Sequence, residues 1–271
     1  MSEGRQEAPL AALLVGMLTC LGLPLLYVHG TECLNALSRV NASGQVGTKV
    51  VLPLAVASVA IWLARLLWRL VGVRLQVRTL PDLAELPEAL AAAITRTGVE
   101  GGVRCLAADV PTAFCVGAFR PRILVSEGLV HQLGAAELDA VLLHEREHVR
   151  SFEPLIRAVH DSASEVFFYV PLVRWWSRRR IEDSELRADR VALERLGPRP
   201  VAAALWTLGR STAVLGSAAF GGAPELRVAQ LLGDPLPARG PGLPLVAISG
   251  IGAYMAFQVA FCLVQAAQRL I

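Results

Sequence analysis

Two histidines four residues apart are the first feature of the sequence with clear chemical use. The segment HEREH places His144 and His148 one helical turn apart, with Glu145 directly after the first histidine. Positions i and i+4 of an α-helix share a face, so both imidazoles can bind one metal ion while the glutamate lies beside the open coordination position. The spacing therefore predicts a catalytic zinc site on a helix, with Glu145 as the general base.

A zinc site of this kind needs a third protein ligand, because catalytic sites typically combine three ligands with a water. The downstream motif ELRAD offers Glu185, with Asp189 one helical turn later. One carboxylate could bind the metal while the other accepts a hydrogen bond from a ligand imidazole. Glu182 and Asp183 are competing ligands, and the charges of this stretch are also typical of a solvated helix face with ion pairs.

The elements that must position these side chains have recognisable local signals. Residues 87–97 predict a helix that Gly98 closes, and Ser126 can cap a helix that Gly134 breaks. The HEREH motif then lies on a helix over residues 135–151. Three short β-prone runs separated by prolines span residues 103–110, 113–118 and 122–125. We therefore expect an α+β fold, mainly helical with a small sheet.

The composition indicates that part of the chain lies in a lipid bilayer. Of 271 residues, 54% are hydrophobic and 18% are charged, whereas soluble domains have about 45–50% and about 25%. The mean hydropathy is +0.49. A net charge of +3 is too small to indicate a surface that binds nucleic-acid phosphates, so we expect no nucleic-acid partner. The apolar content excludes a disordered chain.

Three long apolar stretches account for the excess and are expected to be transmembrane helices. They span residues 8–28, 50–73 and 243–268. A hydrocarbon core needs about 20 helical residues, which the middle stretch supplies if Arg65 and Arg69 extend to the headgroups. Further arginines follow this stretch, whereas the loop before it has few basic residues. The asymmetry predicts a domain over residues 74–240 on the cytoplasmic side of the plasma or inner membrane.

A shorter apolar segment lies inside the predicted domain. Residues 166–176 read VFFYVPLVRWW and are followed by three arginines at 178–180. The segment is too short to cross a bilayer, and aromatic residues beside arginines are typical of an interfacial element. A buried hairpin of the soluble domain is the alternative.

Together, these motifs resemble the membrane-embedded gluzincin metallopeptidases. Residues 113–154 contain, in order, A-F-x-x-G, R-P-x-I-x-V-S and the H-E-x-x-H helix, and ELRAD follows. Two branches are similar, the BlaR/MecR-type sensor-transducers with their stand-alone relatives and the HtpX-type membrane proteases. The expected topology favours the first branch. Only three residues follow Gln268, so we expect a stand-alone form without a penicillin-binding sensor domain.

The resemblance implies a zinc ion bound by His144, His148 and Glu185, with Asp189 orienting a ligand and Glu145 catalysing hydrolysis. It implies an integral membrane endopeptidase that cuts a cytoplasmic or juxtamembrane protein, with a transcriptional repressor as the candidate substrate. The alternatives are a quality-control protease of the HtpX type and a non-catalytic signalling subunit stabilised by zinc. The strand expected to bind an extended peptide contains Ala113, Phe114, Cys115, Val116 and Gly117. Candidates for stabilising the oxyanion are Tyr169, His160 and Arg187.

Overall fold

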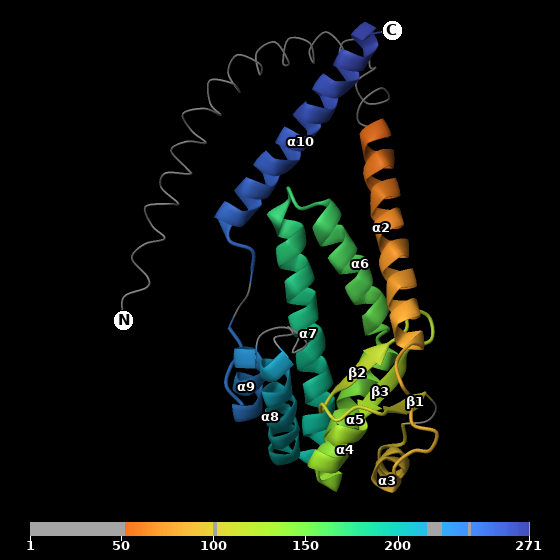
Figure 1. Ribbon diagram of the computed structural model, residues 1–271. Coiled ribbons are helices and arrows are strands. Elements are labelled where there is room, and N and C mark those ends of the chain that lie inside the picture. The colour runs from red at the N-terminus through yellow and green to blue at the C-terminus, as the bar shows by residue number, and fades with distance from the viewer. Residues whose placement is uncertain (1–51, 100–101, 216–223, 238–239, 271) are drawn as a thin grey trace. The chain divides into compact units, whose positions relative to one another are not determined.

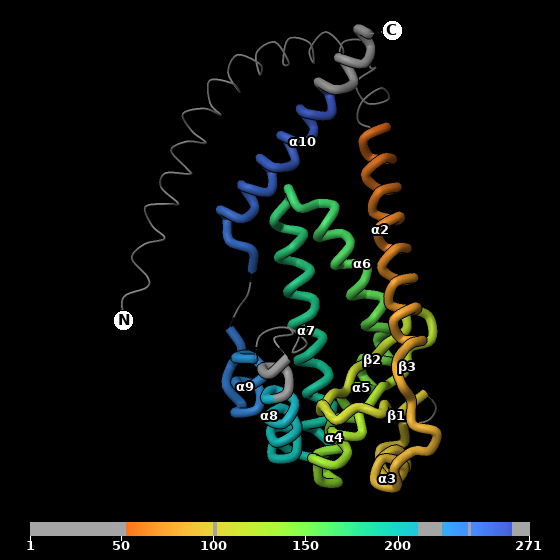
Figure 2. Tube along the Cα trace, viewed as in Figure 1, coloured from red at the N-terminus to blue at the C-terminus, as the bar shows by residue number. Residues whose placement is uncertain are grey.

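The computed structural model describes residues 52–99, 102–215, 224–237 and 240–270, so the predicted first span, residues 8–28, lies outside the described residues. The chain divides into two compact units, Met1–Ala60 with Ile251–Ile271, and Ile61–Gly250. Figure 1 labels the elements, and Figure 2 traces the same path as a tube. The helices are α2 (Leu52–Arg78), α3 (Glu88–Thr97), α4 (Glu127–Gln132), α5 (Ala135–Arg150), α6 (Glu153–Val166), α7 (Pro171–Leu196), α8 (Pro198–Leu215), α9 (Pro224–Leu232) and α10 (Leu243–Leu270). The strands are β1 (Val103–Leu106), β2 (Ala113–Val116) and β3 (Arg122–Ser126).

The described chain is mostly helical with one small sheet, which confirms the expected fold class. The sheet has the order β1-β3-β2, with β1 parallel and β2 antiparallel to β3, so β2 lies at an edge. Apolar side chains of α3, β3, α4 and α5 fill the core between the sheet and the helices. Its fully buried members include Leu90, Ile123, Leu129, Leu138 and Leu142.

Two helix boundaries follow from capping residues that the sequence predicts. The Ser126 hydroxyl accepts a hydrogen bond of 3.2 Å from the Leu129 amide and so begins α4. Gly98 adopts φ 64°, the left-handed conformation that favours glycine, and ends α3. These two residues therefore set the end of α3, which precedes β1, and the start of α4, which follows β3.

Two strands are shorter than the sequence predicts. The first ends at Leu106 because the following backbone turns to lie against Gly128, where a Cβ atom would lie 1.9 Å from the Asp109 carbonyl oxygen. The second ends at Val116 because Gly117 has φ 100°, a conformation that interrupts a strand. The expected extensions to residues 110 and 118 are therefore wrong.

Two described helices are long and apolar enough to cross a membrane. They cover Pro53–Arg78 and Leu243–Phe261. These segments overlap the second and third predicted spans. Their insertion in a bilayer, and a cytoplasmic position for residues 74–240, stay predictions.

Residues 166–176 form the tip of a hairpin between α6 and α7. None of them is fully buried, and Phe168 and Trp176 are 77% and 59% exposed. The other residues of this tip are half-buried or exposed, and the alternative of a buried hairpin stays a prediction. Exposure of aromatic side chains at this tip agrees with the interfacial alternative, which stays a prediction.

Candidate metal centre

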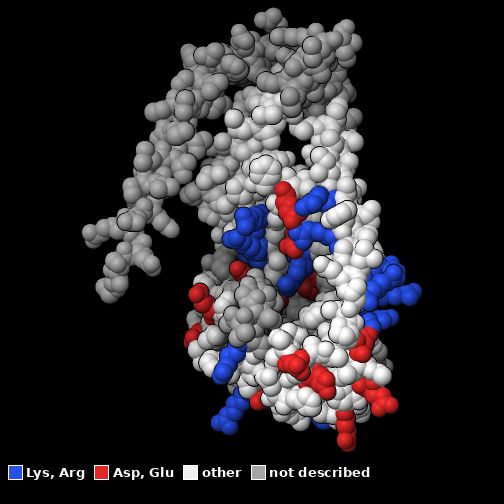
Figure 3. Space-filling view, viewed as in Figure 1, with Lys and Arg blue, Asp and Glu red and all other residues white. Residues whose placement is uncertain are grey.

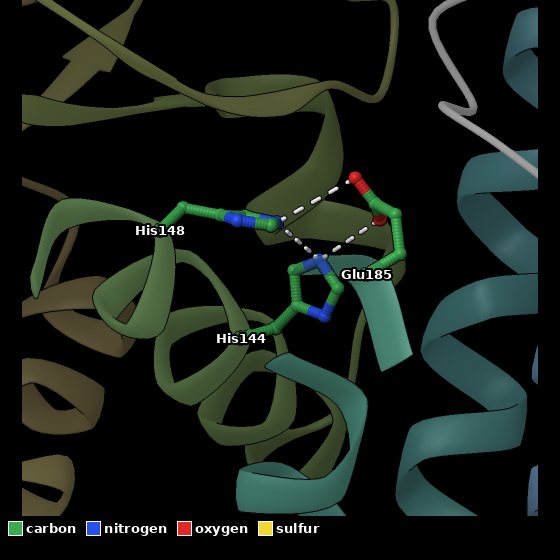
Figure 4. Close-up of side chains that lie close together, drawn as sticks. All are labelled: His144, His148 and Glu185. Atoms are coloured by element: carbon green, nitrogen blue, oxygen red, sulfur yellow. Dashed lines mark hydrogen bonds and ion pairs between the residues drawn. The ribbon is translucent and has the colours of Figure 1, made fainter. Parts of the chain in front are cut away.

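Helix α5 brings the two histidines of HEREH to one point. The Nε2 atoms of His144 and His148 lie 3.1 Å apart, and their rings meet at an interplanar angle of 81°. Two imidazole nitrogens so close together fit a shared ion. Figure 4 shows both rings converging on the same space.

Helix α7, which packs along α5, supplies the third side chain. Glu185 Oε2 lies 3.5 Å from His144 Nε2, and Oε1 lies 3.7 Å from His148 Nε2 (Figure 4). Tetrahedral zinc with bonds of about 2.0–2.1 Å separates neighbouring ligand atoms by roughly 3.3–3.4 Å. The observed distances bracket this value, so the three groups fit a tetrahedral ion with its fourth position open.

The competing acids of α7 have other partners. Glu182 Oε2 and Asp183 Oδ1 lie 3.9 and 3.4 Å from the guanidinium of Arg179. Glu185 is buried, so the interpretation of this stretch as a solvated helix face is wrong at that position. Among the described residues, the group able to hold a metal consists of His144, His148 and Glu185.

Asp189 lies directly behind the first histidine. Its Oδ1 is 2.9 Å from His144 Nδ1, and the residue is only 1% exposed. A carboxylate accepts, so Nδ1 donates its hydrogen to Asp189 and Nε2 is the nitrogen that faces the other two groups. This is the orientation that a metal-binding imidazole requires.

Arg227 of α9 is a site residue that the sequence did not predict. Its Nη2 and Nε donate 2.6 Å hydrogen bonds to the two oxygens of Asp189, and its Nη1 lies 3.2 Å from Glu185 Oε2. Gln230 Nε2 donates to the Leu186 carbonyl oxygen at 2.9 Å and fastens α9 to α7. The guanidinium therefore balances two buried carboxylates and fixes their positions.

The surroundings set the protonation states of the site. Burial alone lowers the pKa of His144, but hydrogen bonds to Asp189 and Glu185 raise it to about 9. Burial lowers the pKa of His148 to about 3 and raises that of Glu145 to about 7. Burial opposes ionisation of Glu185, but its hydrogen bond to His144 holds its pKa below the ordinary value. A neutral His148 and an ionised Glu185 are the forms that bind metal, whereas His144 would release its Nε2 proton when it binds a metal.

A cavity of about 270 Å³ joins this cluster to the sheet edge. Glu145 lines it, together with the first three residues of the predicted peptide-binding strand, Ala113, Phe114 and Cys115. Val116 and Gly117 do not line it. Burial, the main cause, raises the pKa of the Cys115 thiol to about 12, so the thiol is not a nucleophile at neutral pH.

The predicted oxyanion residues lie elsewhere. His160, Tyr169 and Arg187 do not line the cavity, and the His160 ring instead contacts Trp176 at 4.8 Å between centroids. Arg157 does line the cavity, and its Nη2 donates to Glu185 Oε1 at 3.0 Å. The Arg157 guanidinium therefore provides a positively charged hydrogen-bond donor at the cavity, beside the His144, His148 and Glu185 cluster.

Parts of this chain are similar in sequence to known proteins. A family model described as BlaR1 peptidase M56 matches residues 35–201. The protein named Protease HtpX homolog 2, from Methanosarcina mazei, is 36% identical over 64 residues, which are 23% of this chain and 22% of that protein. The matched stretch thus spans under a quarter of that relative. The family match contains the three-residue cluster but ends before Arg227.

Proposed function

Because the chain belongs to the BlaR1 peptidase M56 family, we propose that it is a zinc-dependent membrane endopeptidase. One observation carries the proposal: the ligand atoms of His144, His148 and Glu185 lie within 4.8 Å of one another, beside the buried Glu145. Two imidazoles and a carboxylate leave a fourth position open, as in catalytic zinc sites.

The chemistry follows from the roles of the side chains. His144, His148 and Glu185 would hold the ion, and Asp189 keeps the first imidazole in the required tautomer. A bound zinc ion supplies Lewis acidity, which polarises a peptide carbonyl and makes water a stronger acid. The Glu145 carboxylate takes the proton of the attacking water and returns it to the leaving amide nitrogen.

The substrate is proposed to bind as an added strand. In support, β2 has β3 on one side only within the described sheet, and Ala113, Phe114 and Cys115 line the cavity. An extended peptide that pairs with a sheet edge is recognised through its main chain, so its side-chain sequence matters little. Arg157 lines the cavity, unlike Tyr169, His160 and Arg187, and is the residue proposed to stabilise the oxyanion.

The biological substrate is proposed to be a cytoplasmic or juxtamembrane protein, with a transcriptional repressor first among the candidates. A peptidase tethered by α2 and α10 can convert an event at the membrane into the loss of a regulator. The second candidate role, quality control of membrane proteins, is favoured by the likeness to Protease HtpX homolog 2. The two roles differ in how many proteins are cut.

New protein N-termini in cells test the proposal. We expect cells with the wild-type chain to contain cleavage products that cells with Glu145→Gln lack. One or a few products would support a regulatory role, and many products from membrane proteins would support quality control. Identical termini in both cells, with wild-type amounts of both chains, would contradict peptidase activity and favour the non-catalytic subunit.

A further inference from the structure

A second, charged cavity lies between α2, α6 and α7. Its volume is about 540 Å³, and it shares no lining residue with the cavity at the metal centre. Three arginines, two acidic residues and two serines line it. Figure 3 shows basic and acidic side chains gathered around a hollow on this face.

The acidic side chains of this cavity are already paired with α2. Arg65 Nη2 lies 2.7 Å from Glu165 Oε2, and Arg69 contacts both Glu165 and, at 3.4 Å, Asp161. Glu165 therefore has a pKa below the ordinary value, mainly because Arg69 donates to it. The negative charge in the cavity is thus matched by the guanidinium groups of α2.

Two arginines of α7 supply positive charge without a matching acid. Arg174 and Arg178 are one helical turn apart, line the cavity and are exposed. Within the described ranges, neither forms an ion pair or a side-chain hydrogen bond. Planar guanidinium groups bind phosphate through paired donors, so these side chains are suited to an external phosphate.

Residues typical of a membrane surface adjoin the lining residues of this cavity in the sequence. Trp68 on α2 is 75% exposed, and Trp176 lies on α7 between the two arginines. The Leu172 amide, at the start of α7, donates a 2.8 Å hydrogen bond to Ser249 of α10. Exposed tryptophans and arginines are concentrated where lipid headgroups meet water. Both candidate membrane helices therefore contact the hairpin that forms the cavity.

We propose that this cavity binds the headgroup phosphate of an anionic phospholipid, with Arg174 and Arg178 as its ligands. The acyl chains would lie along the exposed apolar surface of α2. Basic pockets beside membrane helices bind such headgroups through charge. The site would hold the α6–α7 hairpin, and with it the domain that carries Glu185, at a defined depth on the membrane.

The test measures binding of phosphatidylglycerol to the full-length chain in neutral detergent by native mass spectrometry. We expect Arg174→Gln with Arg178→Gln to weaken binding about 30-fold, because two basic residues near a headgroup are lost. The matched control, Arg190→Gln with Arg199→Gln, removes the same charge from exposed positions outside the cavity and should bind as the wild type does. All three chains should unfold at the same temperature, since the substituted side chains are exposed.

Equal affinity in the α7 double variant and the wild type would overturn the proposal, as would an equal loss in the control. Phosphatidylcholine should bind the wild type no better than it binds the α7 variant. Inorganic phosphate distinguishes a lipid site from a free-phosphate site. If phosphate alone binds as tightly as phosphatidylglycerol and displaces it, the assignment to a lipid is wrong.

Discussion

Glu145→Gln is expected to lower peptide-bond cleavage by about 100-fold to 10,000-fold, the range typical of a lost general acid–base group. Glu145 is buried, lines the cavity and directly follows a proposed metal ligand, but is not part of the three-residue cluster. A carboxamide has the same size but cannot take the proton of the attacking water. Metal binding should therefore stay intact while turnover is lost.

Purified full-length chains, supplied with zinc and a peptide substrate, provide the measurement. Glu147→Gln is the matched control, because it lies on the same helix two residues later and does not line the cavity. We expect the control to cleave at the wild-type rate. Cleavage by the Glu145 variant at that rate would show that another group moves the proton.

The second large effect is expected at Arg227. Arg227→Met leaves the buried Asp189 without its guanidinium partner and Glu185 with Arg157 alone, and removing one partner of a buried ion pair costs about 3–5 kcal/mol. Because Asp189 orients His144, zinc affinity should also fall by about 10-fold to 100-fold. Unfolding in detergent gives the first quantity, and zinc titration gives the second.

Two further variants distinguish a loss of metal-ligand positioning from a general loss of protein stability. Arg227→Lys keeps the charge but not the paired donors, so its zinc affinity should lie between those of the wild type and the methionine variant. Arg199→Met, at an exposed position, should match the wild type in both measurements. If Arg227→Met binds zinc as tightly as the wild type, the arginine does not position the metal centre.

The parts of the site that the sequence predicts are those set by short-range geometry. His144 and His148 converge because a helix repeats every 3.6 residues. Ser126 begins a helix because its hydroxyl satisfies a free amide at the helix start. Glu185 and Asp189 are four residues apart on α7, so the helical repeat predicts that both side chains lie on the same face of the helix.

The parts that the sequence does not predict depend on how distant helices pack. Arg227 follows Asp189 by 38 residues and reaches it only because α9 packs on α7. No periodicity or motif connects two such positions. His160 has the right side chain for catalysis, yet its ring contacts Trp176 and Ser177 of α7 and does not line the cavity at the metal centre. The sequence shows that a histidine is present at this position, but the direction of its side chain depends on how α6 and α7 pack.

Zinc content is the most direct test of a metal centre formed by His144, His148 and Glu185. We predict that the full-length chain, purified in detergent and dialysed against zinc at low concentration, holds one zinc ion per chain by elemental analysis. His148→Ala should hold less than about a tenth of that amount, because it removes a metal ligand. His131→Ala, at an exposed histidine away from the cluster, should keep the full amount. Equal zinc in the His148 variant and the wild type, or no zinc in the wild type, would contradict a zinc site at this cluster.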